Sequence, residues 1–229
     1  MSHNPVLSII TVVLNGEKYL EQCIKSVISQ KNVAIEYIII DGESSDGTVG
    51  IIKKYDTFIH YWISEKDDGI SHAFNKGIEK ATGDLVCFLN SDDFFNNDAL
   101  TEIAIFYLKN KDVDIIYANT LFLNEKKEIL IPGNPMAHLF LFYQMSLAHP
   151  SIFFTRRAIK GIGLYDTNYC FAMDYDYLIR ALIKGFRFKY CNQYVSNFRM
   201  GGLTSLFFNK SLEECKKIRV NHNLNEVSL

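Results

Sequence analysis

The sequence predicts an α/β protein in which helices flank a mainly parallel β-sheet. Over the first 95 residues, short apolar runs alternate with segments whose apolar residues recur at helical spacing. This order of strands and helices predicts parallel neighbouring strands, right-handed crossovers and helices on both faces. The chain has 229 residues, of which 48% are hydrophobic and 22% are charged. These values suit one soluble domain of this class.

Four strands and three helices are expected in the first half of the chain. The helix over 17–30 shows the pattern clearly, because Leu20, Cys23, Ile24 and Val27 recur on one helical face. Gly83 closes the helix that precedes the fourth strand. The strands are expected over 6–14, 35–40, 61–64 and 85–89, and the helices over 17–30, 49–55 and 70–81.

The pattern becomes less regular after residue 95. Helices are expected over 99–110, 176–184 and 212–224, and strands over 113–124, 129–131, 151–154 and 186–191. No repeat, low-complexity tract or long linker divides the chain. We therefore expect residues 1–229 to form a single domain, in which a mixed α/β half (96–229) follows the first half (1–95).

The composition and the termini exclude several classes of protein. The formal net charge of −2 argues against nucleic-acid binding. The N-terminus lacks a basic segment ahead of a long apolar run, and no stretch reaches the roughly 18 apolar residues of a membrane span. We therefore expect a cytoplasmic protein, although the apolar stretch 138–149 leaves a peripheral membrane contact open.

Acidic residues follow three of the predicted strands. In an open parallel sheet, ligands bind beyond the carboxyl ends of the strands, so these residues are expected on one edge. Crowded carboxylates repel one another unless a cation offsets the repulsion, and oxygen ligands suit Mg²⁺ or Mn²⁺. Taken singly, each residue is better explained as a turn former or a helix cap, but together, at three strand ends of one sheet, they favour a site. The residues are Asp41, Glu65, Asp67, Asp68, Asp92 and Asp93.

Motifs of two common nucleotide-binding classes are missing. The sequence contains no GxxxxGK[ST] loop, and no GxGxxG follows the first strand. This weakens a P-loop or a nicotinamide-dehydrogenase interpretation.

Three segments together resemble the family 2 glycosyltransferases of the GT-A fold. They are SIITVVLNGEKYLEQCIKSVISQ (8–30), YIIIDGESSDGT (37–48) and SEKDDGISHAFNKGIEKATGDLVCFLNSDD (64–93). The third segment is the most specific, and it resembles the bacterial subgroup that builds O-antigen, capsule and other exopolysaccharides. The resemblance extends from Ser8 to about Ser205. It implies that residues 1–95 bind a nucleotide sugar and that residues 96–229 bind the acceptor.

The resemblance implies a set of donor-binding residues. Thr11, Val12 and Val13 would line the pocket for the base and ribose, and Asp41 would accept a hydrogen bond from the base, which favours uracil and leaves guanine open. The tripeptide 90–92 occupies the position of the family's DxD motif, where Asp92 would bind Mn²⁺ or Mg²⁺. Asn90 replaces the first aspartate, and Asn90 and Ser91 would contact the nucleotide.

The resemblance also implies a catalytic base and further contacts. In FAMDYDYLIRALIKG (171–185), Asp174 matches the base, with an ordinary helix N-cap as the alternative, while Asp176 would point elsewhere and pair with Arg180. The segments LAHPSIFFTRRAI (147–159) and FRMGGLTS (198–205) resemble acceptor-side and donor-covering parts of the family. Candidate donor or acceptor contacts are Asp67, His72, Lys76, His149, Arg199 and Ser205.

The implied activity is inverting transfer of a hexosyl or N-acetylhexosaminyl group from a nucleotide sugar, with UDP favoured. The acceptor would be a saccharide on a lipid carrier, used in surface polysaccharide synthesis at the cytoplasmic face of the inner membrane. Lys216, Lys217 and Arg219 would assist through anionic lipids, or simply form a solvated helix face. Two alternatives are a sugar nucleotidyltransferase and a catalytically silent nucleotide-sugar-binding protein.

Overall fold

The computed structural model describes residues 4–124, 128–130, 134–201 and 207–224. The strands are β1 (Val6–Val13), β2 (Ala34–Asp41), β3 (Tyr61–Ser64), β4 (Leu85–Phe88), β5 (Phe94–Phe95), β6 (Ile115–Leu123), β7 (Glu128–Leu130), β8 (Ile152–Thr155) and β9 (Phe188–Arg199). The α-helices are α1 (Leu20–Ile28), α2 (Thr48–Lys54), α3 (Ile70–Lys80), α4 (Ala99–Lys109), α5 (Arg156–Ile162), α6 (Met173–Ile183) and α8 (Phe208–Asn221). Short 3₁₀ helices are η1 (Asp56–Phe58), η2 (Ala137–Phe142) and η3 (His149–Ser151).

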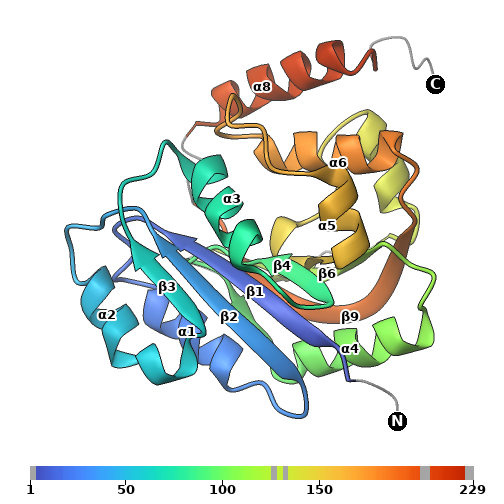
Figure 1. The fold of residues 1–229 in the computed structure, drawn as a ribbon. Coiled ribbons are helices and arrows are strands. Elements are labelled where there is room, and N and C mark those ends of the chain that lie inside the picture. The colour runs from blue at the N-terminus through green and yellow to red at the C-terminus, as the bar shows by residue number, and fades with distance from the viewer. Residues whose placement is uncertain (1–3, 125–127, 131–133, 202–206, 225–229) are drawn as a thin grey trace.

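The first half forms the parallel part of the sheet, as expected. β1 pairs in parallel with β2 on one side and with β4 on the other, and β2 pairs in parallel with β3. The helices α1, α2 and α3 connect these strands (Figure 1). The carboxyl ends of β1, β2, β3 and β4 therefore lie at one edge, which is where such sheets bind ligands.

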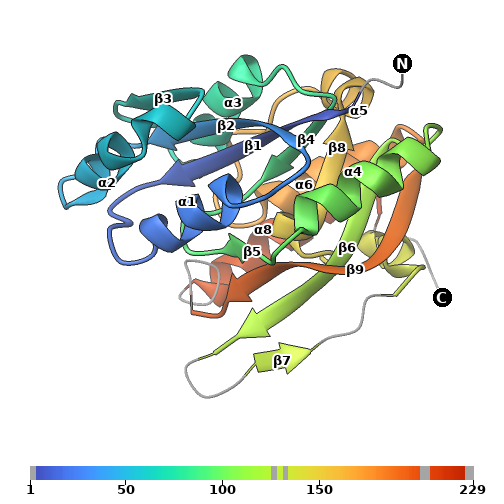
Figure 2. The same cartoon turned by 90° about the horizontal axis from the view of Figure 1, so that it is seen from below.

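The second half continues the same sheet with mixed directions. Within the described residues the strand order is β3-β2-β1-β4-β8-β6-β9-β5, with β7 paired to β6. β8 is antiparallel to both β4 and β6, whereas β9 is parallel to β6. The hydrogen-bonded strands run through both halves, so a single sheet joins them (Figure 2).

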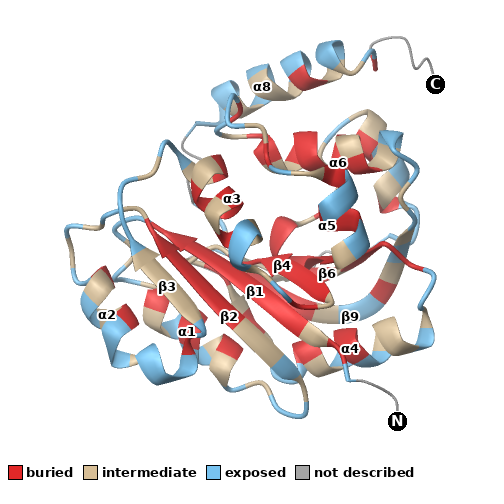
Figure 3. Cartoon of the chain, in the orientation of Figure 1, coloured by how far each residue is buried: buried red, intermediate tan, exposed pale blue. Residues whose placement is uncertain are grey.

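Helices cover the sheet on both faces, and each face has its own apolar core. Helices α1, α2 and α4 pack on one face through residues such as Ile24, Ile52 and Ile103 (Figure 2). Helices α3, α5 and α6 pack on the other, where Phe74 and Leu178 are buried (Figure 3). The central strands β1, β4 and β8 are buried on both faces, which explains their nearly continuous apolar sequences.

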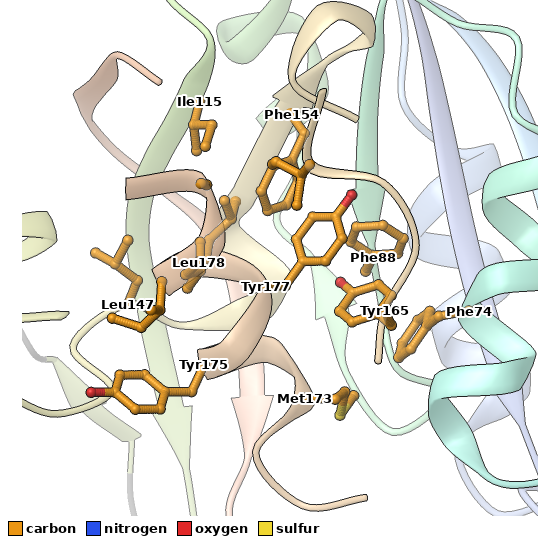
Figure 4. Packing of buried hydrophobic residues seen from close by; sticks show 14 of the residues in the cluster. Phe74, Phe88, Ile115, Leu147, Phe154, Tyr165, Met173, Tyr175, Tyr177 and Leu178 are labelled. Atoms are coloured by element: carbon orange, nitrogen blue, oxygen red, sulfur yellow. The ribbon is translucent and has the colours of Figure 1, made fainter. Parts of the chain in front are cut away.

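A cluster of aromatic rings joins α6 to the parallel half of the sheet. Tyr177 of α6 stacks on Tyr165 with ring centroids 4.3 Å apart, and Phe88 of β4 meets Tyr165 edge-on at 5.2 Å (Figure 4). Phe74 of α3 contacts Phe88 at 5.2 Å. Such pairs stabilise beyond the area that they bury, so the N-terminal end of α6 is held at a defined place beside β4.

Four expectations from the sequence need correction. Helix α8 spans Phe208–Asn221 rather than 212–224. Helix α5 and the short strand β5 were not expected, because Arg156–Ile162 is short and has little apolar periodicity and Phe94–Phe95 is only a dipeptide. Strand β9 extends to Arg199 rather than ending near residue 191, since a register shift opposite Ala118 and Asn119 interrupts the alternation of its side chains. Helix α6 begins at Met173, three residues earlier than expected. Its N-cap residue Ala172 has no capping side chain, so the sequence carried no signal for this start.

No helix among the described residues is both long and apolar enough to cross a membrane.

Candidate functional site

A cavity of about 1230 Å³ lies where the two halves of the chain meet. From the first half it is lined by Val12 and Val13 of β1, Asp67 ahead of α3 and the residues 90–92 after β4. From the second half it is lined by residues of β6 and η2, by His149 and by the N-terminal end of α6. This volume exceeds the range of roughly 300–1,000 Å³ usual for small-ligand sites, so one cavity has room for two substrates.

The loop after β4 forms one wall of the cavity. It is a turn closed by the Asp93 amide, which donates to the carbonyl of Asn90 over 3.1 Å. The side-chain Oδ1 of Asn90 is buried and has no hydrogen-bond partner among the described residues. Because a buried polar atom without a partner costs free energy, this oxygen is suited to a donor group supplied by a ligand.

Two adjacent carboxylates in this loop have different surroundings. Asp92 lines the cavity, and burial raises its pKa, against a smaller lowering by the charge of Arg199. Asp93 is only 1% exposed, and burial followed by the charge of Asp92 raises its pKa well above the usual value. The next helix, α4, has Asp98 as its N-cap residue, without a side-chain cap. The interpretation of Asp92 or Asp93 as a cap of the next helix was therefore wrong.

A metal ion at the described residues of this cavity would need further ligands besides them. No group of three or more His, Cys, Asp or Glu side chains among the described residues is arranged to hold one. Asp92 alone brings a carboxylate from the 90–92 loop to the cavity. Mg²⁺ is commonly bound by one or two carboxylates together with substrate phosphates. The residues present therefore fit a cation that arrives with a phosphorylated ligand.

Two residues expected in the nucleotide pocket do not line the cavity, and their side chains are bonded within the protein. Thr11 is fully buried, and its hydroxyl lies 3.2 Å from Tyr37 Oη. Asp41 is also fully buried, and its carboxylate accepts hydrogen bonds from the Ser44 amide and hydroxyl and from the Ser64 hydroxyl. Asp41 thus holds together the loop after β2, whereas the neighbouring Val12 and Val13 line the cavity.

A cluster of ion pairs joins Lys76 of α3 to two carboxylates in the segment before this helix. Lys76 Nζ lies 2.6 Å from Asp67 Oδ1 and 2.7 Å from Glu65 Oε1. Burial alone would lower the pKa of Lys76, but the hydrogen bonds to Asp67 and Glu65 outweigh it and raise the pKa. Of this cluster Asp67 lines the cavity, while His72 accepts a hydrogen bond from the Asp68 amide over 3.1 Å.

His149 lies in the wall of the cavity as a neutral, packed ring. It stacks on Phe88 with ring centroids 5.5 Å apart and planes 6° apart, and its Nε2 lies 3.0 Å from Tyr165 Oη. Burial lowers the pKa of His149 to about 4. The ring is therefore uncharged at neutral pH and can contribute a hydrogen bond or a contact surface to a ligand, but no charge.

Arg199 is used to hold the 90–93 loop. Its guanidinium donates to the carbonyl of Asp92 and, over 2.6 Å, to Gln22 Oε1. The same group lies over the rings of Tyr19 and Phe94, 4.4 and 4.8 Å from their centroids. Arg199 thus uses its guanidinium group for contacts with Asp92, Gln22 and two aromatic rings of the protein. Ser205, the other candidate in this segment, lies outside the described residues.

Asp174 lies in the first turn of α6 and lines the same cavity as the 90–92 loop. The N-cap of α6 is Ala172, so the alternative of a plain N-cap for Asp174 was wrong. Burial raises the pKa of Asp174 to about 6, against a lowering by the Tyr175 amide, which donates to Oδ1 over 2.8 Å. Asp176 is buried and pairs with Arg180 at 2.8 Å, as the sequence predicted.

Sequence reasoning missed several residues of this site. Asn119 and Thr120 of β6 line the cavity, and their polar side chains interrupt an apolar strand, which was a usable signal. Asn119 accepts from Tyr190 Oη over 2.7 Å. Glu214 of α8 reaches the segment before α6, and no local pattern in the sequence marks it.

Comparison with known proteins gives consistent matches over most of the chain. The sequence model of the family described as Glycosyl transferase family 2 matches residues 8–180. The uncharacterized glycosyltransferase Rv1514c of Mycobacterium tuberculosis is 31% identical over 188 residues, which cover 80% of this chain and 71% of that protein. The PGL/p-HBAD biosynthesis glycosyltransferase Rv2957 of the same species is 27% identical over 219 residues, which cover 90% and 82%.

Solved structures share the fold at low sequence identity. S. aureus TarS 1-349 in complex with UDP superposes with a TM-score of 0.77 and 18% identity, and the match covers 97% of this chain and 67% of that one. The mannosyltransferase PcManGT from Pyrobaculum calidifontis, in complex with GDP-Man and Mn²⁺, gives a TM-score of 0.76 and 14% identity, with 99% and 66% covered. At this identity the two structures bear on the fold alone.

Proposed function

Since the chain belongs to glycosyl transferase family 2 and has the GT-A form of the α/β fold, we propose that it is an inverting glycosyltransferase. It would move a sugar from a nucleotide-sugar donor to a hydroxyl group of a saccharide acceptor. One observation carries the proposal: Asp174, whose pKa is about 6, lines the same cavity as the 90–92 loop. The proton acceptor Asp174 and the carboxylate of Asp92, which could hold a cation together with a diphosphate, thus line one cavity.

Asp174 acts as the general base in this proposal. With a pKa of about 6 its carboxylate is ionised at neutral pH, and it is basic enough to take a proton from an acceptor hydroxyl. The oxygen attacks the anomeric carbon while the bond from that carbon to the leaving phosphate breaks. The nucleoside diphosphate departs with the bonding electrons on the opposite face, so the anomeric configuration inverts. A positioned base contributes on the order of 10²–10⁴ in rate.

The donor would occupy the side of the cavity formed by β1 and the loop after β4. Val12 and Val13 would contact the nucleoside, and the unpartnered Oδ1 of Asn90 would accept a hydrogen bond from a ribose hydroxyl. Ser91 lies beside them, next to Gly16, where an added Cβ would come within 3.2 Å of Ser91 Oγ. We favour UDP carrying a hexosyl or N-acetylhexosaminyl group, since the similar TarS binds UDP, with GDP as the competitor.

A divalent cation, Mn²⁺ or Mg²⁺, would be held by Asp92 together with the donor diphosphate. When bound, the cation offsets the negative charge that develops on the leaving diphosphate. Asn90 brings no charge at the first position of the DxD-like tripeptide, so Asp92 would be its principal protein ligand. The similarity to PcManGT, which was solved with Mn²⁺, supports a metal.

The acceptor side of the cavity suits a sugar attached to an apolar carrier. Phe140, Met145, Leu147, Phe171 and Met173 line it. Phe140 and the nearby Leu139 are 49% and 41% exposed, and Lys216 and Lys217 of α8 are exposed as well. These residues support a lipid-linked acceptor and a peripheral contact with the cytoplasmic face of the inner membrane. The product would be a surface polysaccharide such as O-antigen or capsule, with a glycolipid, as for the PGL relative, as the alternative.

A donor panel tests the proposal. Calorimetric titration with UDP and GDP, with and without Mn²⁺, measures nucleotide binding. Incubation with UDP- and GDP-linked sugars and an alkyl glycoside acceptor measures transfer. Release of nucleoside diphosphate with a new glycosidic bond of inverted configuration is the expected result. Consumption of a nucleoside triphosphate and a sugar phosphate would indicate a sugar nucleotidyltransferase, and binding without turnover would indicate a catalytically silent protein.

A further inference from the structure

The C-terminal helix α8 is joined to the segment that carries Asp174 by one glutamate. Glu214 Oε2 accepts hydrogen bonds from the amides of Phe171 at 2.7 Å and Ala172 at 2.8 Å. The Cys170 amide donates to both carboxylate oxygens, at 3.0 and 3.1 Å. One side chain therefore satisfies three consecutive backbone amides that lie 42 to 44 residues away in the sequence.

These amides belong to the wall of the cavity. Cys170 and Phe171 line the cavity. Ala172 is the N-cap residue of α6, and its side chain makes no capping hydrogen bond. The amides at the start of a helix lack partners within it and need acceptors from elsewhere. Glu214 supplies such an acceptor for the N-cap Ala172 and bonds the two amides before it, so it holds the segment that leads into Met173 and Asp174.

Polar contacts of this kind do much to hold α8 in place. Among its described residues only Ile218 is fully buried, and most of the helix is exposed (Figure 3). Asn221 donates to Tyr169 Oη over 2.9 Å, and His222 Nε2 lies 2.9 Å from Asp176 Oδ1. A helix of 14 residues is marginal by itself in water, so its docking on the 169–176 region depends on these bonds.

We propose that Glu214 is a positioning residue for Asp174, and this rests on the proposed role of Asp174 as the base. The three hydrogen bonds hold residues 170–172 so that the Asp174 carboxylate faces the cavity. The negative charge of Glu214 also disfavours ionisation of Asp174 and so keeps the base stronger. The C-terminal helix is thereby part of the active-site architecture.

Three variants separate these effects. Glu214→Ala removes all the acceptors, and Glu214→Gln keeps one acceptor oxygen but loses the charge. Glu213→Ala is the matched control, because Glu213 is the adjacent, exposed residue of the same helix. For each variant, kcat, donor Kd and the pH profile of kcat are measured, together with hydrogen exchange at the amides of 170–172. Circular dichroism identifies variants that do not fold.

We expect Glu214→Ala to lower kcat roughly ten- to a hundredfold with donor Kd within about twofold, since a small displacement of a base is costly. Both Glu214 variants should move the acidic limb of the pH profile down by about half a pH unit, because a negative charge near Asp174 is gone. Glu214→Gln should retain more of kcat than Glu214→Ala. Unchanged kcat and an unchanged acidic limb in a folded Glu214→Ala protein would overturn the proposal.

Hydrogen exchange distinguishes failure of this proposal from failure of the proposed function. It needs no substrate, and amides bonded to Glu214 should be protected in the wild type and in Glu213→Ala. Loss of protection at 170–172 in Glu214→Ala alone supports the ordering of this segment by Glu214, even if no donor is turned over. Equal protection in all three proteins would overturn it. A wild-type protein that transfers no sugar, with the exchange result as expected, would instead refute the role of Asp174.

Discussion

The backbone amide of Arg199, at the end of β9, donates a hydrogen bond to Oδ1 of the buried Asp93 over 3.0 Å. The two residues are 106 positions apart. The bond joins the last strand of the sheet to the loop that presents Asn90 and Asp92 to the cavity. The guanidinium of Arg199 adds a second connection through the carbonyl of Asp92. The loop is thus held from behind, and its cavity side stays accessible.

Replacing Arg199 should loosen this loop. Arg199→Ala removes the guanidinium bonds to Asp92 and Gln22 and its contacts with two aromatic rings. We expect the free energy of unfolding to fall by about 2 kcal/mol, measured by urea denaturation. Nucleotide affinity should weaken as well, since Asp92 loses its support. Arg199→Lys keeps the charge but lacks the planar guanidinium, so its stability and nucleotide affinity should lie between those of the wild type and of Arg199→Ala. Wild-type stability and affinity in Arg199→Ala would contradict this role.

Asp174→Asn should strongly slow transfer while leaving donor binding intact. The amide has nearly the same shape but cannot accept the proton, so we expect kcat to fall by about 10²–10⁴. In the wild type, kcat should decrease as the pH falls below about 6, where the carboxylate becomes protonated. Single-turnover assays and calorimetry measure the two quantities. Transfer at the wild-type rate in Asp174→Asn would refute the assignment.

The same substitution should change the pH dependence of stability. Burial raises the pKa of Asp174 from 3.8 to about 6 in the folded protein. The folded state therefore holds this proton more tightly than the unfolded chain, and stability decreases as the pH rises through this window. Asp174→Asn lacks this loss. The Tm of the variant relative to the wild type should increase between pH 4 and pH 7, and a constant difference would contradict the raised pKa.

Asp92→Ala should remove the metal dependence of donor binding. In the wild type we expect Mn²⁺ to strengthen UDP binding at least about tenfold, because a dication offsets the charge of the diphosphate. In Asp92→Ala, calorimetry should give the same UDP affinity with and without Mn²⁺. Asp112→Ala is the control, since its side chain is 71% exposed and does not line the cavity. Retained metal dependence in Asp92→Ala would exclude Asp92 as the ligand.

His149 should make the protein sensitive to acid. Burial lowers its pKa from 6.5 to about 4, so the unfolded chain binds a proton in this window that the folded protein does not. The free energy of unfolding should therefore fall as the pH decreases from 6.5 to 4, by on the order of 3 kcal/mol. His149→Phe keeps a ring against Phe88 but cannot titrate. Urea denaturation at pH 7.5 and 4.5 gives the change in the free energy of unfolding with pH for each protein. All other titrating groups are common to both, so the difference between the two changes isolates the effect of His149. Equal changes in the two proteins would refute it.

Gly77 should be required for the packing of α3 on β1. A Cβ at this position would overlap Cγ2 of Ile10 in the core of the sheet. Gly77→Ala should therefore lower stability by about 1–3 kcal/mol, although alanine favours helices. Gly50 of α2 has nothing within 4 Å of an added Cβ, so Gly50→Ala should raise stability by up to about 1 kcal/mol. Thermal unfolding of both variants compares the two, and a stable Gly77→Ala protein would contradict the close packing.

The sequence predicted those parts of the site that follow from local pattern. Strand ends on a parallel sheet share one edge, so Asp67 and Asp92 could be expected to face one cavity, whereas Val12 and Val13 were implied by the family resemblance. Thr11 and Asp41 could not be assigned in this way, because alternation along a strand and closure of a loop decide which way a side chain turns. The same applies to Asp93, which is adjacent to Asp92 but is buried behind it.

The sequence by itself determined the fold class, the family resemblance and the order of the elements from β1 to β4, since these depend on periodicity and on short motifs that act over neighbouring residues. Only the tertiary structure decided which distant residues support the site. Arg199 reaches Asp93 across 106 positions, and Glu214 reaches Phe171 across 43. Such pairs form because the sheet and the packing of α8 bring backbone amides and carboxylates together. A lone Glu or Arg on an exposed helix or strand carries no local signal of that partner.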